Sequence, residues 1–335
     1  MIELRSDTFT KPSKEMLDCM FAAQVGDDVW DEDYTVKSLE KHIALLFGME
    51  AALFCPSGTM ANQIAIKVHT QPGDEVICDY SSHIYQYEAG GIAFNSSASV
   101  NLLQGTNGKI TVDIVQAALK EENIHFSKQS LVSVENTTNK GGGACYKLSD
   151  LQDLSTFCKA KNLAFHMDGA RLYNAIVKTK TKPADYGSIF DSISVCMSKG
   201  LGAPIGSLLL GNKAFITQAK RIRKVLGGGM RQAGYLAAAC EYALDNNIDL
   251  LQHDHRRAKE IEATLKSLDY VNDLLPVETN IVIFSVSNPA SLVDYLKTKN
   301  ILCSAIGPKQ IRFVTHLQFT DQMLDLLIKS LLDWK

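Results

Sequence analysis

Short, continuous apolar runs alternate with longer helical patterns along most of this chain, and that alternation limits the fold more than any other feature. The apolar runs are Ala51–Cys55, Glu75–Asp79, Ser130–Val134, Leu163–Met167, Ile193–Met197 and Ser207–Leu210. A strand that is buried on both faces is apolar throughout, and not only at every second residue. Helical segments such as Met60–His69 and Leu148–Lys161 lie between the runs. The alternation predicts an α/β fold with a mostly parallel central sheet.

The pattern changes after about residue 230, where helices become longer and strands fewer. The expected elements are helices at Gln232–Asn246, Asp249–Leu268 and Ser291–Lys299, strands at Asn280–Val286 and Gln310–Thr315, and a last helix from Thr320. No repeat or Pro/Gly-rich linker separates the two parts. We therefore expect a large domain with an N-terminal arm at residues 1–245 and a small α+β domain at residues 246–335.

Composition excludes several classes of protein. The net charge of −3 gives no basic excess for binding nucleic acid. No run of about 18 apolar residues is present, so we expect no membrane span. The polar start MIELRSDTFTKPSKE lacks the apolar segment of a secretory signal. The eight cysteines form no C-x-x-C pair, which favours buried free thiols in a reducing compartment. These features predict a cytoplasmic protein.

Ligands of open α/β sheets collect at the carboxyl ends of the strands, and the residues there are informative. Ser57, Gly58 and Thr59 stand between a strand and a helix, where free N–H groups bind anions. The segment has neither the P-loop nor the dinucleotide glycine pattern, and a plain helix cap is the alternative. His83 follows the next strand, where an imidazole can stack on a ligand or transfer a proton; a purely structural histidine is the alternative.

Two later strands end in charged residues. Asp168 follows Leu163–Met167 and suits a charge-assisted bond to a protonated ring nitrogen, while Arg171 can reach a phenolate or a carboxylate. An ion pair between these two residues is the alternative. Lys199 follows a buried strand and precedes small residues; a desolvated lysine amine forms Schiff bases. A lysine whose charged end reaches solvent is its alternative.

Together these pieces supply the contacts that pyridoxal 5'-phosphate requires: a phosphate cradle, a stacking ring, an acid for the ring nitrogen and a Schiff-base amine. The eight histidines show no H-x-x-x-H spacing, and no metal is expected.

Nine short motifs in order along the chain resemble the low-specificity L-threonine aldolases of the β-eliminating lyase group. They are LRSDTFT at Leu4–Thr10, GDDV at Gly26–Val29, PSGTMANQ at Pro56–Gln63, SSHIY at Ser81–Tyr85, ENT at Glu135–Thr137, HMDGAR at His166–Arg171, SKGLGAPIGS at Ser198–Ser207, GGGMRQAG at Gly227–Gly234 and RFVTH at Arg312–His316. The resemblance implies fold type I of the pyridoxal-phosphate enzymes, with a seven-stranded sheet and helices on both faces.

The resemblance also implies roles for residues at the cofactor. Lys199 would form the Schiff base, Asp168 would pair with the pyridinium nitrogen and His83 would stack on the ring. Ser57, Gly58 and Thr59 would hold the phosphate. Arg171 would lie near the phenolic oxygen. Lys224 and Arg231 would reach the cofactor site of a neighbouring subunit, and a homotetramer built of two dimers is therefore expected.

On the substrate side, the resemblance implies a carboxylate site made by Ser6, Arg171 and Arg312. His83 and His125 would lie near the substrate hydroxyl, and the catalytic base would be His83 or a water held by both histidines. The implied substrate is a small β-hydroxy-α-amino acid, and the implied reaction is the cleavage of L-threonine or L-allo-threonine to glycine and acetaldehyde. Alternatives are β-elimination or racemisation on the same cofactor, or non-catalytic binding of it.

Three segments depart from the family pattern, and the last of them is the unusual stretch Gly141–Cys145. The family has an aromatic residue followed by glycine at Trp30–Asp31, and proline at Tyr34. It commonly has histidine at Thr138. We expect the first segment to lie near the substrate, where it would affect side-chain preference.

Overall fold

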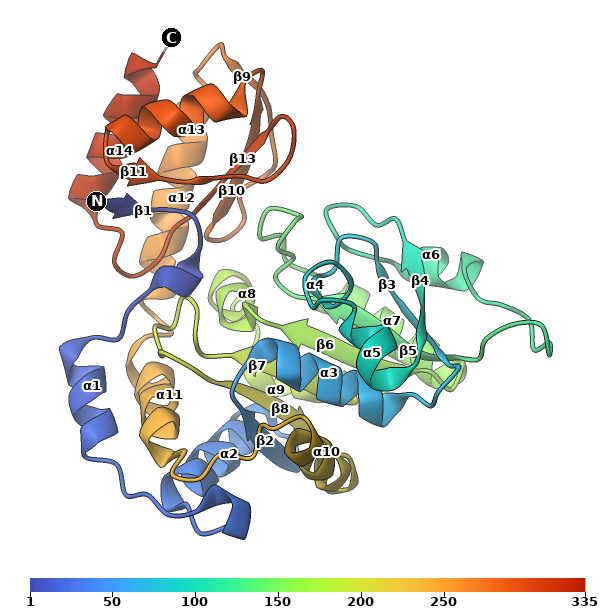
Figure 1. Cartoon of the computed structure of the whole chain (residues 1–335). Helices are drawn as coiled ribbons and strands as arrows, with labels where there is room; N and C mark the ends of the chain where they lie inside the picture. The colour runs from blue at the N-terminus through green and yellow to red at the C-terminus, as the bar shows by residue number, and fades with distance from the viewer. Residues whose placement is uncertain (335) are drawn as a thin grey trace.

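The computed structural model describes residues 1–334. A seven-stranded sheet with the order β2-β8-β7-β6-β5-β3-β4 lies at its centre (Figure 1). The strands are β2 (Ala51–Cys55), β3 (Glu75–Asp79), β4 (Ser99–Leu103), β5 (Gln129–Glu135), β6 (Ala164–Gly169), β7 (Ser192–Cys196) and β8 (Ser207–Gly211). Only β8 runs antiparallel to its neighbours, β2 and β7, among the strands of this sheet. The α/β fold with a mostly parallel sheet is confirmed.

Helices cover both faces of the sheet, and the strand residues divide between two apolar layers. Leu208 and Leu210 join the main core beneath α2, α7, α8, α9 and α11, whereas Leu209 packs with α3 and α10 on the opposite face. The helices are α2 (Tyr34–Phe47), α3 (Gly58–His69), α4 (His83–Gln86), α5 (Gly91–Ser96), α6 (Val112–Ala117), α7 (Leu148–Ala160), α8 (Leu172–Thr179), α9 (Pro183–Gly187), α10 (Lys213–Val225) and α11 (Gly234–Asn246). Burial on both faces explains the continuous apolar runs.

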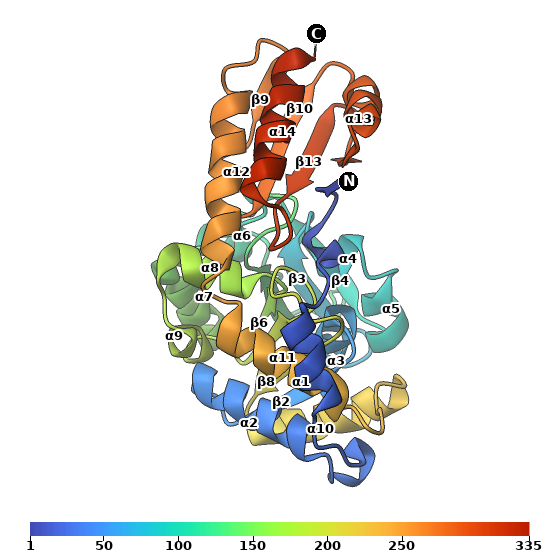
Figure 2. The same ribbon diagram turned by 90° about the vertical axis from the view of Figure 1, so that its left-hand side faces the viewer.

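The C-terminal part has a core of its own around an antiparallel sheet of order β12-β13-β10-β9. Its elements are α12 (Leu251–Leu265), β9 (Val271–Leu274), β10 (Ile281–Val286), α13 (Pro289–Thr298), β11 (Ile301–Leu302), β12 (Ser304–Ala305), β13 (Gln310–Val314) and α14 (Asp321–Asp333). Figure 2 shows it above the central sheet, with the N-terminus beside it.

The N-terminal segment connects the two parts. Its first strand, β1 (Ile2–Glu3), pairs in parallel with β11 of the C-terminal part. The chain then descends past the central sheet through η1 (Asp7–Phe9), α1 (Lys14–Phe21) and η2 (Asp28–Trp30). This path places residues 4–10 between the small sheet and the ends of the large one (Figure 1).

Two smaller expectations also meet the structure. Seven of the eight cysteines are buried free thiols, but Cys19 on α1 is exposed, so the expectation of burial is wrong there. Within residues 1–334, no helix is both long and apolar enough to cross a membrane.

Candidate active site

A cavity of about 510 Å³ opens at the carboxyl ends of the parallel strands, beneath the C-terminal sheet. Its wall includes five residues that the sequence analysis selected: Ser6, His83, Arg171, Lys199 and Arg312. They come from the N-terminal segment, from the segments after β3, β6 and β7, and from β13. Strand ends and one N-terminal arm therefore bring together residues that lie up to 306 positions apart in the sequence.

Asp168 lies at the end of β6, next to this cavity, and only 3% of it is exposed. Its Oδ2 accepts a hydrogen bond from Asn62 Nδ2 at 2.9 Å, and its Oδ1 accepts one from the Ala170 N–H at 3.0 Å. The same Asn62 amide also donates to Glu88 Oε1 at 3.0 Å. Asp168 thus keeps lone pairs free, and it does not pair with Arg171.

His83 begins the short helix α4, and two buried carboxylates fix its position. Its backbone N–H donates to Glu135 Oε2 at 2.8 Å, and its Nδ1 lies 3.0 Å from Glu88 Oε1. Burial lowers the pKa of His83, but the hydrogen bond to Glu88 and the charge of Asp168 outweigh burial, so the pKa is raised. With Nδ1 engaged by a carboxylate, Nε2 is the nitrogen left to act as a base or acceptor.

His83, Glu88 and Asp168 place potential metal-ligand atoms within 4.8 Å of one another. Hydrogen bonds to Asn62 and between His83 and Glu88 already use several of those atoms. The geometry therefore fits an organic ligand at least as well as a metal ion.

Lys199 follows β7 and is half-buried, with its Nζ 3.6 Å from Cys196 Sγ. The first turn of α3 approaches the same sulfur, since a Cβ on Gly58 would lie 2.5 Å from it. Ser57 caps this helix by accepting the Met60 N–H at 3.1 Å. The N–H groups of Gly58 and Thr59 have no intrahelical acceptor, and they can bind an anion near the lysine amine.

Two arginines hold positive charge on the other side of the cavity. Arg171 is 7% exposed and binds both carboxylate oxygens of Asp7, at 2.8 and 2.7 Å. Burial raises the pKa of Asp7, but the charge and hydrogen bonds of Arg171 outweigh burial and lower that pKa to about 2. Arg312 donates to Asn139 Oδ1 and to the Arg5 carbonyl, and its buried Nε has no partner. Burial and the nearby Arg171 lower the pKa of Arg312.

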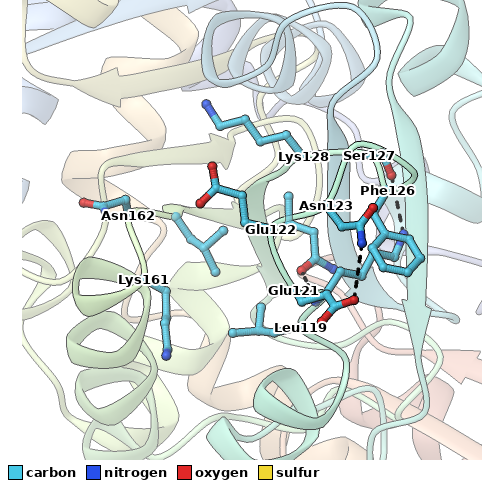
Figure 3. A pocket seen from close by; sticks show the side chains of 12 residues that line it. Leu119, Glu121, Glu122, Asn123, Phe126, Ser127, Lys128, Lys161 and Asn162 are labelled. Atoms are coloured by element: carbon cyan, nitrogen blue, oxygen red, sulfur yellow. Dashed lines mark hydrogen bonds between the residues drawn. The ribbon is translucent and has the colours of Figure 1, made fainter.

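The structure does not bring His125 to this cavity within one chain. His125 is exposed in the long loop between α6 and β5, which enters β5 at its amino end. That loop lines a different cavity of about 710 Å³, together with Gln129 and Leu163 at the starts of β5 and β6 (Figure 3). Lys199 lies at the carboxyl end of the sheet, so a role for His125 beside it requires another copy of the chain.

Lys224 and Arg231 also lie outside the cavity wall and are exposed. Arg231 pairs with Asp27 at 2.8 Å, and the Asp28 N–H donates to the Arg231 carbonyl. Both cations therefore face outward on the surface formed with η2.

A sequence profile of the family described as "Beta-eliminating lyase" matches residues 3–289. The chain belongs to the beta-eliminating lyase family. It is 42% identical over 327 residues to the low specificity L-threonine aldolase of Escherichia coli K12, covering 97% of this chain and 96% of that one. A probable low-specificity L-threonine aldolase of Schizosaccharomyces pombe is 40% identical and is covered to 85% of its length.

Solved structures agree on the fold. A structure of Leishmania major threonine aldolase superposes with a TM-score of 0.89 at 23% identity, over 99% of this chain and 98% of that one. A putative L-allo-threonine aldolase from Listeria monocytogenes gives 0.83 at 21% identity, over 98% and 95%. The resemblance inferred from the motifs is confirmed, and so is the fold class.

The departures from the family pattern have different structural outcomes. Trp30 and Tyr34 are 73% and 69% exposed and are not part of the cavity wall of a single chain, so their expected position near the substrate stays a prediction. Thr138 is buried, and its hydroxyl donates to the Asn107 carbonyl at 2.9 Å. Gly141 packs against the same carbonyl, which leaves no space there for a side chain.

Sequence reasoning missed the residues that hold the selected ones in place. They are Asp7, Asn62, Glu88, Glu135 and Asn139. Four of these lie inside or next to the family motifs, but a motif gives only the amino acid at each position and not the residue that it contacts. Their partners lie in other elements, and the spacing along the chain contains no signal for such pairs.

Proposed function

We propose that this protein is a pyridoxal-phosphate-dependent aldehyde-lyase that cleaves L-threonine or L-allo-threonine to glycine and acetaldehyde. The observation that most supports this is the single cavity in which Lys199, His83 and two arginines meet beside Asp168. The similarity to L-threonine aldolases over 97% of the chain supports the same reaction.

The residues present fit pyridoxal phosphate. Ser207 Oγ is buried without a partner, and it lies 3.6 Å from the position that a Cβ on Gly58 would take, beside the open turn of α3. Arg312 is part of the cavity wall, and its buried Nε has no partner. We propose that Ser57, Gly58 and Thr59 hold the phosphate, that Asp168 accepts from the ring nitrogen and that Lys199 forms the covalent link. When bound, pyridoxal phosphate supplies a ring that accepts the electron pair of the breaking Cα–Cβ bond.

Arg171, Arg312 and Ser6 would bind and orient the substrate carboxylate. Arg171 is anchored by Asp7, and Arg312 by Asn139, so both guanidinium groups are held before substrate arrives. Fixed donors of this kind lower the entropic cost of orienting a substrate. The cavity wall holds more cations than carboxylates, and this excess favours an anionic ligand. The cations are Lys140, Arg171, Lys199 and Arg312, and the carboxylate is Glu135.

His83 would accept the proton of the substrate β-hydroxyl at Nε2. Its hydrogen bond to Glu88 fixes the ring and stabilises the charge that His83 gains. Asp168 would keep the proton on the ring nitrogen, because a carboxylate at that position stabilises the positive charge.

Product analysis tests the proposal. The holoenzyme is incubated with L-threonine and, in parallel, with L-allo-threonine. Acetaldehyde and glycine in equal amounts support aldol cleavage, whereas a 2-oxo acid with ammonia identifies β-elimination. A protein that lacks a cofactor absorption band dependent on Lys199 would contradict the whole proposal.

We further propose a homotetramer in a reducing compartment such as the cytoplasm. Two apolar side chains on the segments that carry or contact the outward-facing cations are exposed: Trp30 of η2 to 73% and Val225, which follows Lys224, to 84%. Large exposed apolar side chains that cluster favour contact with another chain. The free state of the thiols supports the compartment.

A further inference from the structure

A chain of buried hydrogen bonds runs from Asp168 between the sheet and α3 to the far end of that helix, and the reaction proposed above does not use it. We name it the buried polar chain; its members are Asn62, His166, Ser192 and His69. Asn62, His166 and Ser192 are between 0% and 2% exposed. His69, at the far end of α3, is half-buried and stacks on Phe215 with ring centroids 4.7 Å apart. Burying four linked polar side chains costs free energy unless each polar group has a hydrogen-bond partner.

The orientation of the Asn62 amide is fixed by its neighbours. Its Nδ2 faces the carboxylates of Asp168 and Glu88 at 2.9 and 3.0 Å, and carboxylates accept only. Its Oδ1 therefore points the other way, where it accepts from Ser194 Oγ at 2.6 Å and lies 3.2 Å from His166 Nε2. Both donors and both lone pairs of the amide are thus used.

That orientation fixes every proton further along. His166 Nε2 must carry a hydrogen, because Asn62 Oδ1 can only accept. Burial lowers the pKa of His166 to about 3, so the ring is neutral and Nδ1 accepts from Ser192 Oγ at 2.8 Å. The single hydroxyl proton of Ser192 is then used, and Ser192 must accept from His69 Nε2, also at 2.8 Å. All donors in the chain point toward Asp168.

We propose that the buried polar chain is a positioning device that holds the Asp168 side chain directed at the ring nitrogen of the cofactor. Asn62, His166, Ser192 and His69 are positioning residues, since none of them is part of the cavity wall. This inference rests on the proposed function, because it assigns a task to the carboxylate of that site.

Removing the Ser192 hydroxyl would disturb the chain at its centre. Without that hydroxyl, the buried His166 Nδ1 and His69 Nε2 both lose their partner, and the His166 ring is no longer held on that side. A ring that shifts loosens its hydrogen bond to Asn62 Oδ1, so the amide that donates to Asp168 is held less firmly. The proton on the cofactor nitrogen should then be held less firmly.

The experiment uses holoenzyme loaded with pyridoxal phosphate that carries ¹⁵N at its ring nitrogen, and it reads the nitrogen signal by NMR. We expect the signal in Ser192→Ala to move toward the unprotonated position, with kcat lowered about threefold to tenfold and KM changed less than about twofold. The matched control is Ser155→Ala, which also removes a buried serine hydroxyl, one that donates to the Ile189 carbonyl at 2.7 Å outside the chain. In the control the nitrogen signal should stay in place.

His69 provides a second arm if Ser192→Ala does not fold. His69→Leu keeps an apolar contact with Phe215 but removes the donor to Ser192, whereas His69→Gln retains an N–H donor. We expect a smaller movement of the signal in His69→Leu and none in His69→Gln. If Ser192→Ala folds and binds the cofactor but its nitrogen signal does not move, the inference is overturned. If Ser192→Ala does not fold, an unmoved signal in His69→Leu overturns the inference instead.

Failure of this inference differs from failure of the proposed function. If the Lys199-dependent absorption band is present and threonine is cleaved, but the nitrogen signal does not respond, only the inference is wrong. If the wild-type chain binds no pyridoxal phosphate, the proposed function is wrong.

Discussion

At the scale of the residue, Asp168 is the side chain whose loss should cost the most in turnover. A charge-assisted hydrogen bond contributes about 1.5–3 kcal/mol, which corresponds to roughly tenfold to a hundredfold in rate. We therefore expect Asp168→Ala to lower kcat by at least about tenfold. The measurement is steady-state cleavage of L-threonine with saturating cofactor. Near-normal turnover would remove Asp168 from its proposed role, and Asp113→Ala, an exposed carboxylate on α6, serves as control.

The pH dependence of activity should identify His83 as the base. Its pKa is raised, and below that pKa the ring is charged and unable to accept a proton. The rate should therefore rise with pH through a midpoint above the ordinary histidine value. Glu88→Gln removes a carboxylate that raises the pKa of His83. Burial, which lowers that pKa, is unchanged, so the midpoint of the rate profile should move to lower pH. The profile of kcat/KM against pH tests this, and an identical acidic limb in both proteins would contradict the role of His83.

Whether a site residue can be predicted from the sequence depends on whether its role follows from local structure or from contacts with distant elements. Lys199, Asp168 and His83 follow apolar runs, so their positions at strand ends are local information. Glu88 and Asn62 act through contacts with other elements, 2.6–3.2 Å away across the fold, and no periodicity encodes these contacts. His125 shows the converse, since its sequence context matches the family while its position in the chain is far from the cavity.

At the scale of the element, the first turn of α3 packs closely against the end of β7, and in the proposed site the same turn also binds the cofactor phosphate. A methyl group on Gly58 would lie 2.5 Å from Cys196 Sγ, which itself lies 3.6 Å from Lys199 Nζ. Gly58→Ala should displace the Cys196 sulfur, and with it the Lys199 amine, away from α3. We expect this displacement to weaken the binding of pyridoxal phosphate. Overpacking of this kind costs about 1–3 kcal/mol.

A second substitution separates crowding from other effects of Gly58→Ala. Cys196→Ala removes the sulfur that the new methyl group meets, so the double variant should recover much of the cofactor affinity. Titration of the apoenzyme with pyridoxal phosphate, followed by absorbance, gives the dissociation constants. Equal affinity in the single and double variants would show that the sulfur contact is not the cause.

Elements with a uniform environment could be predicted, and those with a mixed environment could not. The predicted strands Ala51–Cys55 and Glu75–Asp79 match β2 and β3 to the residue, because nine of their ten residues are buried. β4 was missed because four of its five residues are not buried, in contrast to β2 at the opposite edge of the sheet. The pairing of β1 with β11 joins residues about 300 positions apart, which no local pattern can reveal.

At the scale of the whole molecule, the cavity is incomplete without a second copy if Lys224 and Arg231 belong to it. In one chain both cations are exposed beside Trp30 and Val225, outside the cavity wall, and Arg231 is paired with Asp27. A symmetric dimer that covers this apolar surface brings each copy's cations to its partner. A chain with Lys224→Ala should then weaken cofactor binding in its partner's site, where the Schiff-base lysine belongs to the partner.

Subunit mixing tests that arrangement. Lys199→Ala and Lys224→Ala chains are each weakly active or inactive alone. If Lys224 serves the partner's site, a mixed dimer has one site with both lysines intact, and random pairing of equal amounts makes about a quarter of all sites functional. If Lys224 serves its own chain, no site in any dimer holds both lysines. Activity after dissociation and reassembly of the mixture should therefore exceed that of either variant, and the absence of any gain in reassembled oligomers would place the complete site within one chain.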